Sequence, residues 1–447
     1  MRILIKNGLL ITDADSPPRE SDLLVAEGKI AALAGNLEAA RADKIIDARG
    51  KVIVPGFVQT HVHLCQALFR GSADDLTLLT WLKERIWPLE ALHSEESTYY
   101  SALLGGLELL KSGTTCVGVM ESVRHTEATA RALQELGIRA VFGKAMMDFG
   151  DTPGQLGALP GAFQETTEET LRASLKLLQK WHGAAGGRLH YAFCPRGILT
   201  TSEKLLHELK GISDREGVLI HTHACENREE SALVEARRGL REIKYLHRLG
   251  LTGPRLLLAH CVWVDEEDMA ILGRTSTRVA HCPSANLKLG SGIAPTHKML
   301  QKGITLSLGA DGAPCNNSLN IFQEMRLAAL LPKGVTQDAA VMPAREVFRM
   351  ATLGGARALG REEECGSIAV GKKADLVFLN LKSERVVPSP DPVAAIVYAA
   401  GRDAVRDVMV DGRFLVREGR FLLGAEDQIL TQAQRALNNI LITFAGR

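Results

Sequence analysis

The middle of this chain, from residue 56 to residue 365, alternates short apolar segments with longer segments of helical periodicity. Helical spacing of apolar residues occurs, for example, in residues 97–110, 126–136, 171–181 and 231–249. Between such stretches lie eight candidate strands, which end near Thr60, Val117, Lys144, Phe193, Ile220, Ala259, Ala280 and Leu308. Eight strands alternating with helices over about 310 residues predict an α/β fold, a closed (β/α)8 barrel of the TIM type. A doubly wound open sheet is the alternative, but the glycine-rich phosphate loop that normally follows one of its strands is missing from the sequence.

The two ends of the chain have a different pattern, made of short β-type runs separated by turn formers. Glu27-Gly28 separates two such runs near the start, and Asp411-Gly412 is a strong signal for a two-residue hairpin turn near the end. Each end is too short to hold a core of its own, so we expect the two ends to combine. The predicted domains are a small composite β-sandwich of residues 1–55 and 366–447, and the barrel of residues 56–365.

Composition excludes several classes of function. The 53 Lys and Arg side chains balance 52 Asp and Glu side chains, so a net charge of +1 gives no reason to expect nucleic acid or an anionic membrane as a partner. No apolar run approaches the roughly 18 residues of a membrane span, and the first residues are typical of a charged strand and not of a signal peptide. The eight cysteines are scattered without a Cys-x-x-Cys pair, which favours a reducing compartment. We therefore expect a cytoplasmic protein.

Histidines and one aspartate gather at the carboxyl ends of the predicted strands. Parallel barrels carry their active sites at this rim, because the loops there bring residues from different strands together. His61 and His63 lie two residues apart on one strand, so both imidazoles share a face and can bind one divalent cation, for which zinc is the natural choice. His223 and Asp311 can complete the ligand set. The full group in chain order is His61, His63, His221, His223, His260, His281 and Asp311.

Two of these histidines have a different expected role. A single histidine on a strand is more often a satisfied core residue than a metal ligand. His221 lies two residues before His223, on the same face but deeper, where we expect it to orient a ligand. For His281 an orienting role and simple packing remain equal alternatives.

Five segments resemble the amidohydrolase superfamily. They are similar to the branch that holds methylthioadenosine and S-adenosylhomocysteine deaminases, 5'-deoxyadenosine deaminases, guanine deaminases and s-triazine hydrolases, and the resemblance covers essentially the whole chain. It implies one zinc ion, with iron as the alternative, held by His61, His63, His223 and Asp311. Binuclear members bridge two metals with a carboxylated lysine on the fourth strand, and the absence of lysine from residues 189–194 favours a single metal. The matching segments are residues 54–63, 223–226, 258–260, 281–292 and 310–313.

These parts together predict hydrolytic deamination. Zinc makes hydroxide available near neutral pH, and Asp311 would take a proton and later pass it to the departing amine. Glu226, three residues after His223, would protonate a ring nitrogen of the substrate, although it could also be a solvated acid at the start of a helix. His260 would polarise the water or the developing oxyanion. The other zinc-deaminase plan, His-x-Glu followed by Pro-Cys-x-x-Cys, is missing from the sequence.

Residues around this predicted site indicate which amine is the substrate. Trp81 lies in a loop that resembles adenosine-type members, in which the tryptophan can pack on a flat base or sugar. Those members carry an acidic residue shortly before the tryptophan to hold ribose, and Leu79 stands at the matching place. Gln66 and Arg196 resemble positions with which guanine deaminases hold the base edge, but Gly197 replaces the phenylalanine that usually follows.

We expect the substrate to be a small amino-heterocycle, most favourably a 5'-modified adenosine. Guanine or 8-oxoguanine is the next alternative, followed by an s-triazine. A hypothesis from another functional class, a non-catalytic metal-binding barrel scaffold, remains an alternative. A homo-oligomer is expected by family analogy alone. The predicted substrate contacts are Gln66, Trp81, Arg196, His281 and Asn316.

Overall fold

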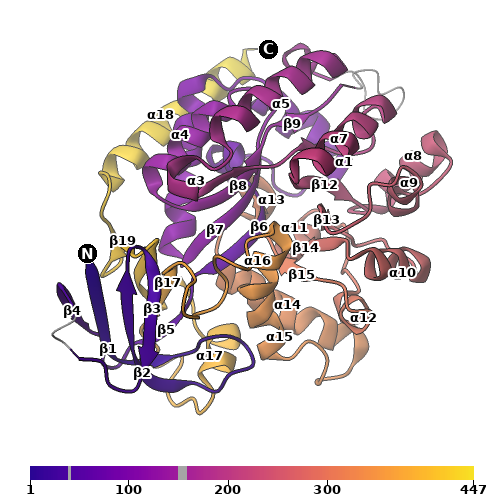
Figure 1. Ribbon diagram of the computed structural model, residues 1–447. Coiled ribbons are helices and arrows are strands. Elements are labelled where there is room, and N and C mark those ends of the chain that lie inside the picture. Colours follow the sequence, from indigo (N-terminus) through magenta and orange to yellow (C-terminus); the bar gives the residue numbers. More distant parts are fainter. Residues whose placement is uncertain (39–41, 149–158, 447) are drawn as a thin grey trace.

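The computed structural model describes residues 1–38, 42–148 and 159–446 (Figure 1). Its central sheet has the strand order β10-β8-β7-β6-β15-β14-β13-β12, and all neighbours in this order are parallel. The bounds are β6 (Phe57–His63), β7 (Thr114–Met120), β8 (Arg139–Gly143), β10 (Leu189–Tyr191), β12 (Ile220–Ala224), β13 (Leu256–His260), β14 (Arg278–His281) and β15 (Leu306–Leu308).

This sheet closes on itself. Just beyond β10, Phe193 forms a parallel bridge with Ile220 of β12. Phe193 N donates to Leu219 O at 2.9 Å, and His221 N donates to Phe193 O at 2.9 Å. A doubly wound sheet keeps two free edges, so the closure excludes that alternative and confirms the predicted barrel.

Helices cover the outside of the barrel. The segment predicted as one helix over residues 231–249 forms two, because Gly239 ends the first of them in the left-handed conformation with φ 71°. The longer helices are α3 (Glu95–Lys111), α4 (Thr126–Leu136), α5 (Thr167–Trp181), α7 (Glu203–Glu216), α8 (Arg228–Arg238), α9 (Glu242–Arg248), α10 (Glu266–Thr275), α12 (Thr296–Gln301), α14 (Ile321–Thr336), α15 (Ala344–Met350) and α16 (Leu353–Leu359).

Short elements occupy the connections, most of them on the side where the barrel strands end. The segment after β6 is the most elaborate and consists of four consecutive turns: η2 (Leu64–Phe69), α1 (Leu78–Trp81), η3 (Leu82–Ile86) and α2 (Trp87–Glu90). The others are β9 (Ala145–Met146), η4 (Gly161–Phe163), α6 (Ala184–Gly187), β11 (Cys194–Pro195), α11 (Pro283–Lys288), β16 (Asp311–Gly312) and α13 (Ala313–Asn316).

A second, mixed sheet contains strands from both ends of the chain and lies at the lower left of Figure 1. Its order is β20-β19-β18-β17-β5-β1-β2-β3, with β4 also paired to β1. Ile5 and Leu23 from the first segment and Leu376 and Met409 from the last share one hydrophobic core. The strands are β1 (Arg2–Leu10), β2 (Arg19–Ala26), β3 (Lys29–Ala34), β4 (Lys44–Asp47), β5 (Val52–Pro55), β17 (Leu376–Leu379), β18 (Val405–Val410), β19 (Arg413–Arg417) and β20 (Arg420–Phe421), and the turns α17 (Pro392–Tyr398) and η5 (Arg402–Ala404) connect β17 to β18.

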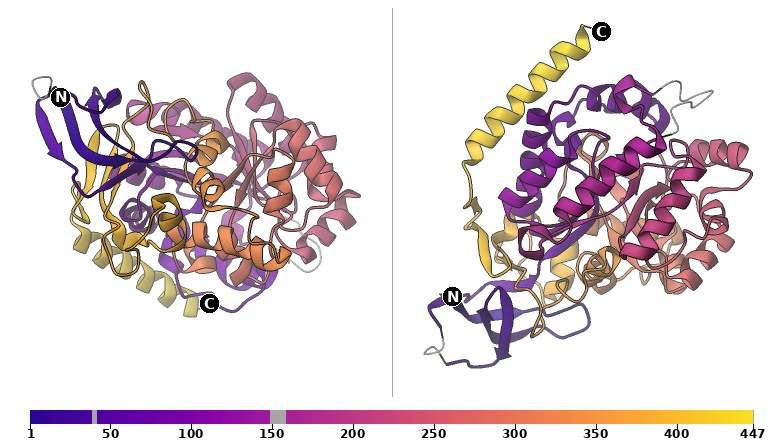
Figure 2. Two further views of the ribbon diagram at one scale, coloured as in Figure 1. Left: turned by 90° about the horizontal axis from the view of Figure 1, so that it is seen from below. Right: turned by 45° about the horizontal axis from the view of Figure 1, so that its top comes forward.

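The last helix, α18 (Glu426–Ala445), runs along the outside of the barrel (Figure 2). Its buried residues Ala436 and Ile440 share a cluster with Phe69 and Leu89 from the connection after β6. The sequence analysis placed residues 366–447 together in the end domain, whereas this helix buries its apolar face against barrel elements. The predicted domain limits therefore stay a prediction. Helix α18 departs from them, because it packs on the barrel although its residues belong to the predicted end domain.

An ion-pair group joins the barrel to the end sheet. Arg139 begins β8, and its guanidinium, which is 0% exposed, contacts Asp375 at 2.8 Å, Asp411 at 2.8 Å and Glu364 at 3.2 Å. Asp375 immediately precedes β17, and Asp411 lies in the turn between β18 and β19. The buried guanidinium thus fixes two segments of the end sheet against one barrel strand.

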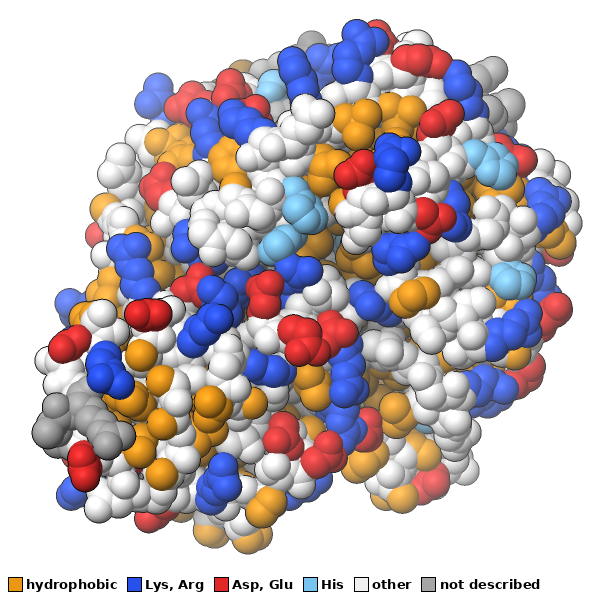
Figure 3. All heavy atoms as spheres, viewed as in Figure 1, with side chains coloured by type: hydrophobic (Ala, Val, Ile, Leu, Met, Phe, Trp, Pro, Cys, Tyr) orange, Lys and Arg blue, Asp and Glu red, His pale blue; other side chains and the backbone are white. Residues whose placement is uncertain are grey.

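The surface carries both signs of charge. On the face shown in Figure 3, Lys and Arg side chains are interspersed with Asp and Glu side chains, and no broad region of a single sign covers it. Among the described residues, none of the helices combines the length and the apolar composition that crossing a membrane requires.

Candidate metal centre and substrate pocket

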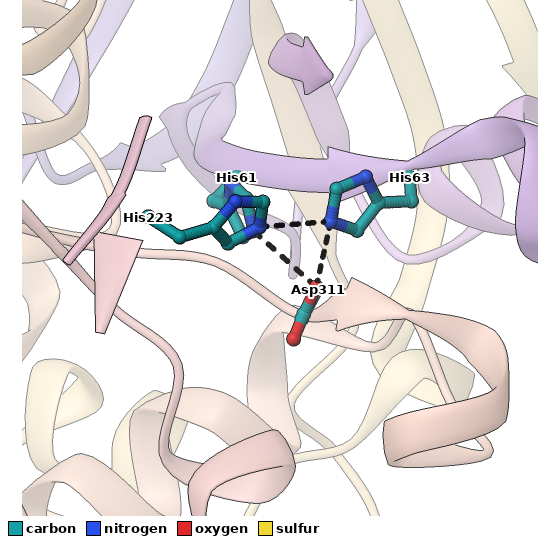
Figure 4. A group of neighbouring side chains, drawn as sticks. All are labelled: His61, His63, His223 and Asp311. Atoms are coloured by element: carbon teal, nitrogen blue, oxygen red, sulfur yellow. Dashed lines mark hydrogen bonds and ion pairs between the residues drawn. The ribbon is translucent and has the colours of Figure 1, made fainter. Parts of the chain in front are cut away.

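Four predicted ligand residues converge at the carboxyl ends of the barrel strands (Figure 4). His61 and His63 come from β6, His223 from β12 and Asp311 from β16. Asp311 Oδ1 lies 3.3 Å from His61 Nε2 and 3.2 Å from His63 Nε2, and the Nε2 atoms of His63 and His223 are 3.3 Å apart. One ligand atom from each residue lies within 4.8 Å of all the others. The geometry therefore brings the four side chains to one common centre.

The local backbone explains this convergence. The two-residue period of β6 turns both His61 and His63 into the barrel mouth. Asp311 adopts a left-handed conformation with φ 63°, which is uncommon for a residue with a side chain and occurs most often at functional sites. Gly309 lets this segment approach β6 closely, because a Cβ atom there would lie 2.7 Å from His61 O.

Each ligand histidine is held through its other ring nitrogen. Nδ1 of each ring makes a hydrogen bond, so Nε2 is left to face the common centre. His221 has the orienting position that the sequence predicts, while the other two partners are backbone carbonyl groups. The contacts are His61 Nδ1 to His221 Nε2 at 2.9 Å, His63 Nδ1 to Met120 O at 2.8 Å and His223 Nδ1 to Arg196 O at 2.5 Å.

The electrostatics of the centre suit a cation. Burial lowers the pKa of His61 to about 4 and that of His223 well below its usual range, so both imidazoles are neutral near pH 7. Burial alone would raise the pKa of Asp311, but His61 and His63 outweigh it and hold this pKa well below its usual range. His61 Nε2 is buried without a hydrogen-bond partner. Neutral imidazoles and an ionised carboxylate are the ligand forms that a divalent metal requires.

A second group adjoins the first. His260 Nε2 lies 3.4 Å from Glu226 Oε2 and 3.8 Å from Asp311 Oδ2. His260 Nδ1 hydrogen-bonds Asn286 Oδ1 at 2.8 Å, which fixes the ring and leaves Nε2 without a hydrogen-bond partner. Burial and the Asp311 carboxylate raise the pKa of Glu226 well above its usual value, so Glu226 holds a proton that it can donate. Sequence reasoning missed Asn286, because its contact with His260 depends on how α11 packs.

A pocket opens beside this centre. Its walls include His63, Glu226 and Asp311 on the polar side. The indole N–H groups of Trp81 and Trp87 are buried without a hydrogen-bond partner. The apolar walls are formed by Leu78, Leu79, Trp81, Leu82, Trp87 and Leu199.

A buried carboxylate that the sequence analysis did not identify lies next to this pocket. Glu90 accepts two hydrogen bonds from the Arg196 guanidinium, at 2.7 and 3.0 Å, and one from Gln66 Nε2 at 2.7 Å. Burial raises the pKa of Glu90, but Arg196 outweighs this effect and lowers it below its usual value. The sequence gives Glu90 no motif of its own, since it lies 24 residues from Gln66 at the end of an irregular segment.

A comparison with protein families agrees with this site. The model of the amidohydrolase family matches residues 52–415. This chain is an amidohydrolase. A 5'-deoxyadenosine deaminase of Methanothermobacter thermautotrophicus is 40% identical over 418 residues, which cover 94% of each chain. A 5-methylthioadenosine/S-adenosylhomocysteine deaminase of Desulforudis audaxviator is 38% identical over 99% of each chain. A zinc-bound crystal structure of an adenosine deaminase from Xanthomonas campestris superposes with a TM-score of 0.91 at 30% identity and covers 98% of each chain.

The amidohydrolase pocket includes three of the five predicted substrate contacts, namely Gln66, Trp81 and Arg196. Asn316 is not part of its lining, because its amide donates to Ala310 O and to Glu324 Oε1, both at 2.8 Å, and so holds the loop after Asp311. His281 is also outside the lining and is buried with its pKa lowered to about 3. For these two residues the expected substrate contact stays a prediction.

Proposed function

We propose that this amidohydrolase is a zinc-dependent deaminase that hydrolyses the exocyclic amine of a 5'-modified adenosine and releases ammonia. The observation that carries the proposal is the joint geometry of two groups. Three imidazoles and Asp311 face one centre, and Glu226 and His260, 3.4 Å apart, lie directly beside it. The relatives named as 5'-deoxyadenosine and methylthioadenosine/S-adenosylhomocysteine deaminases support this choice of substrate.

His61, His63, His223 and Asp311 would hold the zinc ion. The fit rests on the unpartnered Nε2 atom of His61 and on the mutual distances of the four ligand atoms. When bound, zinc supplies a nucleophile by lowering the pKa of water from about 15.7 to about 7. The fourth barrel strand offers no lysine for a second metal, since residues 189–194 contain none.

The side chains of the pocket divide the proton transfers among them. Asp311 accepts the proton of the attacking water and passes it to the departing amine. Glu226, protonated in its buried position, donates to the ring nitrogen next to the attacked carbon and so makes that carbon electrophilic. His260, fixed by Asn286, points Nε2 toward Glu226 and Asp311 and stabilises the oxygen that adds to the ring.

The pocket lining favours adenosine over guanine. Guanine as the substrate would require Gln66 and Arg196 to hold the edge of the base. The Gln66 amide and the Arg196 guanidinium instead donate to Glu90. Flat apolar walls and the two unpartnered indole N–H groups of Trp81 and Trp87 suit a base and the hydroxyl groups of a sugar.

We also propose a cytoplasmic location. All eight cysteines are free and buried in the structure, which fits a reducing compartment. Association into a homo-oligomer stays an expectation from the family alone.

The proposal is tested by zinc analysis and an ammonia-release panel on the purified protein. The panel comprises adenosine, 5'-deoxyadenosine, methylthioadenosine, S-adenosylhomocysteine, guanine, 8-oxoguanine and an aminotriazine. We expect one zinc ion per chain and the highest kcat/KM on a 5'-modified adenosine. Preference for guanine or the triazine contradicts the substrate assignment, and bound zinc without turnover of any compound supports the scaffold alternative.

A further inference from the structure

Glu230 is a carboxyl group of the pocket that the proposed reaction does not use. It lies in the first turn of α8, whereas Glu226 precedes that helix, and both residues line the same pocket. Its Oε2 atom is buried without a hydrogen-bond partner. Its Oε1 atom lies 4.0 Å from the position of a Cβ atom added at Gly197, so the space left by this glycine faces the carboxyl group. Asn227 already caps α8 by accepting from Glu229 N at 2.8 Å.

The described pocket lining offers no free cation to Glu230. Among the described residues that line the pocket, Arg196 is the sole Lys or Arg, and both of its terminal nitrogens donate to Glu90. Glu226 and Glu230 therefore face the ligand across a space with mostly apolar walls. Electrostatic interactions are strong in such surroundings, because little water is present to screen them.

The positions of the two residues assign them to different parts of a ligand. Glu226 is 5% exposed and meets the ring in the proposed mechanism, whereas Glu230 is half-buried as a residue, with its Oε2 atom buried against the pocket. The ring occupies the inner end of the pocket beside the metal centre. Glu230 then faces a substituent that projects away from the ring.

We infer that Glu230 is a specificity-determining residue, which favours adenosine derivatives with a cationic 5' group over those with a neutral or anionic 5' group. This inference rests on the proposed function. Burial and the carboxyl groups of Glu226 and Glu242 raise the pKa of Glu230. A ligand cation stabilises the ionised form of this carboxyl group, whereas a neutral or anionic 5' group leaves it protonated and gains no such interaction.

The test uses three ligands with a cationic, a neutral and an anionic 5' group: 5'-amino-5'-deoxyadenosine, 5'-deoxyadenosine and adenosine 5'-monophosphate. Values of kcat/KM are measured for the zinc-loaded wild type, Glu230→Gln and Glu229→Gln. Glu229 is the matched control, since it precedes Glu230 on α8, is exposed and does not line the pocket. Dissociation constants of the same ligands, measured by calorimetry in the Glu226→Gln background with and without Glu230→Gln, give a second readout that needs no turnover.

We expect the wild type to prefer 5'-amino-5'-deoxyadenosine over 5'-deoxyadenosine by about tenfold, and Glu230→Gln to remove this preference. For 5'-deoxyadenosine and the monophosphate, Glu230→Gln should change kcat/KM less than about threefold. An unchanged preference, an equal loss for all three ligands or the same effect of Glu229→Gln overturns the inference. If the wild type deaminates none of them, the proposed function fails, and the dissociation constants still decide the role of Glu230.

Discussion

The direction of each metal-facing imidazole depends on the atom that its second ring nitrogen contacts. His61 is held by another side chain, His221, while His63 and His223 are held by the carbonyl groups of Met120 and Arg196. Such contacts fix both the tautomer and the angle of a ligand ring. The three Nε2 atoms are consequently aimed before any metal arrives.

At the residue scale, single substitutions should abolish metal binding and proton transfer independently of each other. His63→Ala removes a ligand, so we expect it to lose bound zinc and all turnover. Glu226→Gln keeps the four ligands but cannot donate a proton, so zinc should stay while kcat falls by about 10²–10⁴. Metal analysis and ammonia release on the same samples check both outcomes. Near-full activity of Glu226→Gln would show that another group protonates the ring.

The metal ligands could be predicted from the sequence, but not all of the hydrogen-bond partners that orient them. His61, His63 and His221 follow from two-residue spacing on strands, and Asp311 from its place after an apolar run. Backbone carbonyl groups have no sequence signature, so the partners of His63 and His223 could not be predicted. Glu90 and Asn286 reach the site from the short helices α2 and α11, whose positions depend on tertiary packing.

At the element scale, the close contact between β6 and the segment after β15 depends on Gly309. A Cβ atom at this position would lie 2.7 Å from His61 O and 3.0 Å from His61 N. Gly309→Ala should therefore displace the strand that carries two ligands and weaken zinc binding at least about tenfold. Competition with a chelator measures this affinity.

Gly211→Ala is the control for this change, because nothing lies within 4 Å of the added atom on α7. It should leave zinc affinity unchanged and stabilise the protein by up to about 1 kcal/mol. If Gly309→Ala behaves in the same way, the backbone contact with His61 does not position the ligands.

Glu324 of α14 makes the packing of three helical elements dependent on pH. It is buried and accepts from Ser284 Oγ at 2.7 Å and from Asn316 Nδ2 at 2.8 Å. Burial raises its pKa from about 4.5 to about 7. Between about pH 4.5 and 7 the Glu324 carboxyl group is therefore protonated in the folded protein and ionised in the unfolded chain. The stabilisation that Glu324 adds to the folded state is fully present below about pH 4.5 and is lost as the pH rises through 7.

Glu324→Gln should remove this dependence. Relative to the wild type, its free energy of unfolding is expected to rise by up to about 3 kcal/mol between pH 4.5 and 7. Urea unfolding of both proteins at several pH values measures the difference. Parallel curves for the two proteins contradict the assignment of this proton to Glu324.

Element types were easier to predict than their limits. The alternation of apolar runs predicted all eight barrel strands, but β12 begins at Ile220, where the apolar run ends. The polar residues His221 and His223 continue this strand because they face the barrel mouth and not an apolar core. Likewise, Gly239 divides the long helical pattern after Glu226 into α8 and α9.

On the scale of the whole molecule, Arg139 is a buried electrostatic link between barrel and end sheet. Arg139→Met leaves the carboxylate of Asp375, 1% exposed, without its cation, which should lower the free energy of unfolding by about 3–5 kcal/mol. Arg139→Met with Asp375→Asn should recover part of this loss, because the uncompensated charge is gone.

Urea unfolding measures these differences, with the exposed pair of Arg385 and Asp403 as control. Arg385→Met should cost less than about 1 kcal/mol. An equally small effect of Arg139→Met would mean that apolar packing alone holds the end sheet in place.

The arrangement of the end sheet also decides when it can be completed. β5 pairs with β1 on one side and with β17 on the other, although about 320 residues separate Pro55 from Leu376. At about 5–20 residues per second, a ribosome needs tens of seconds to deliver the second neighbour. During that time the nascent chain carries an open strand edge, which is a template for pairing with other chains. Products of premature termination keep this edge permanently, so they depend on chaperones and proteolysis for their removal.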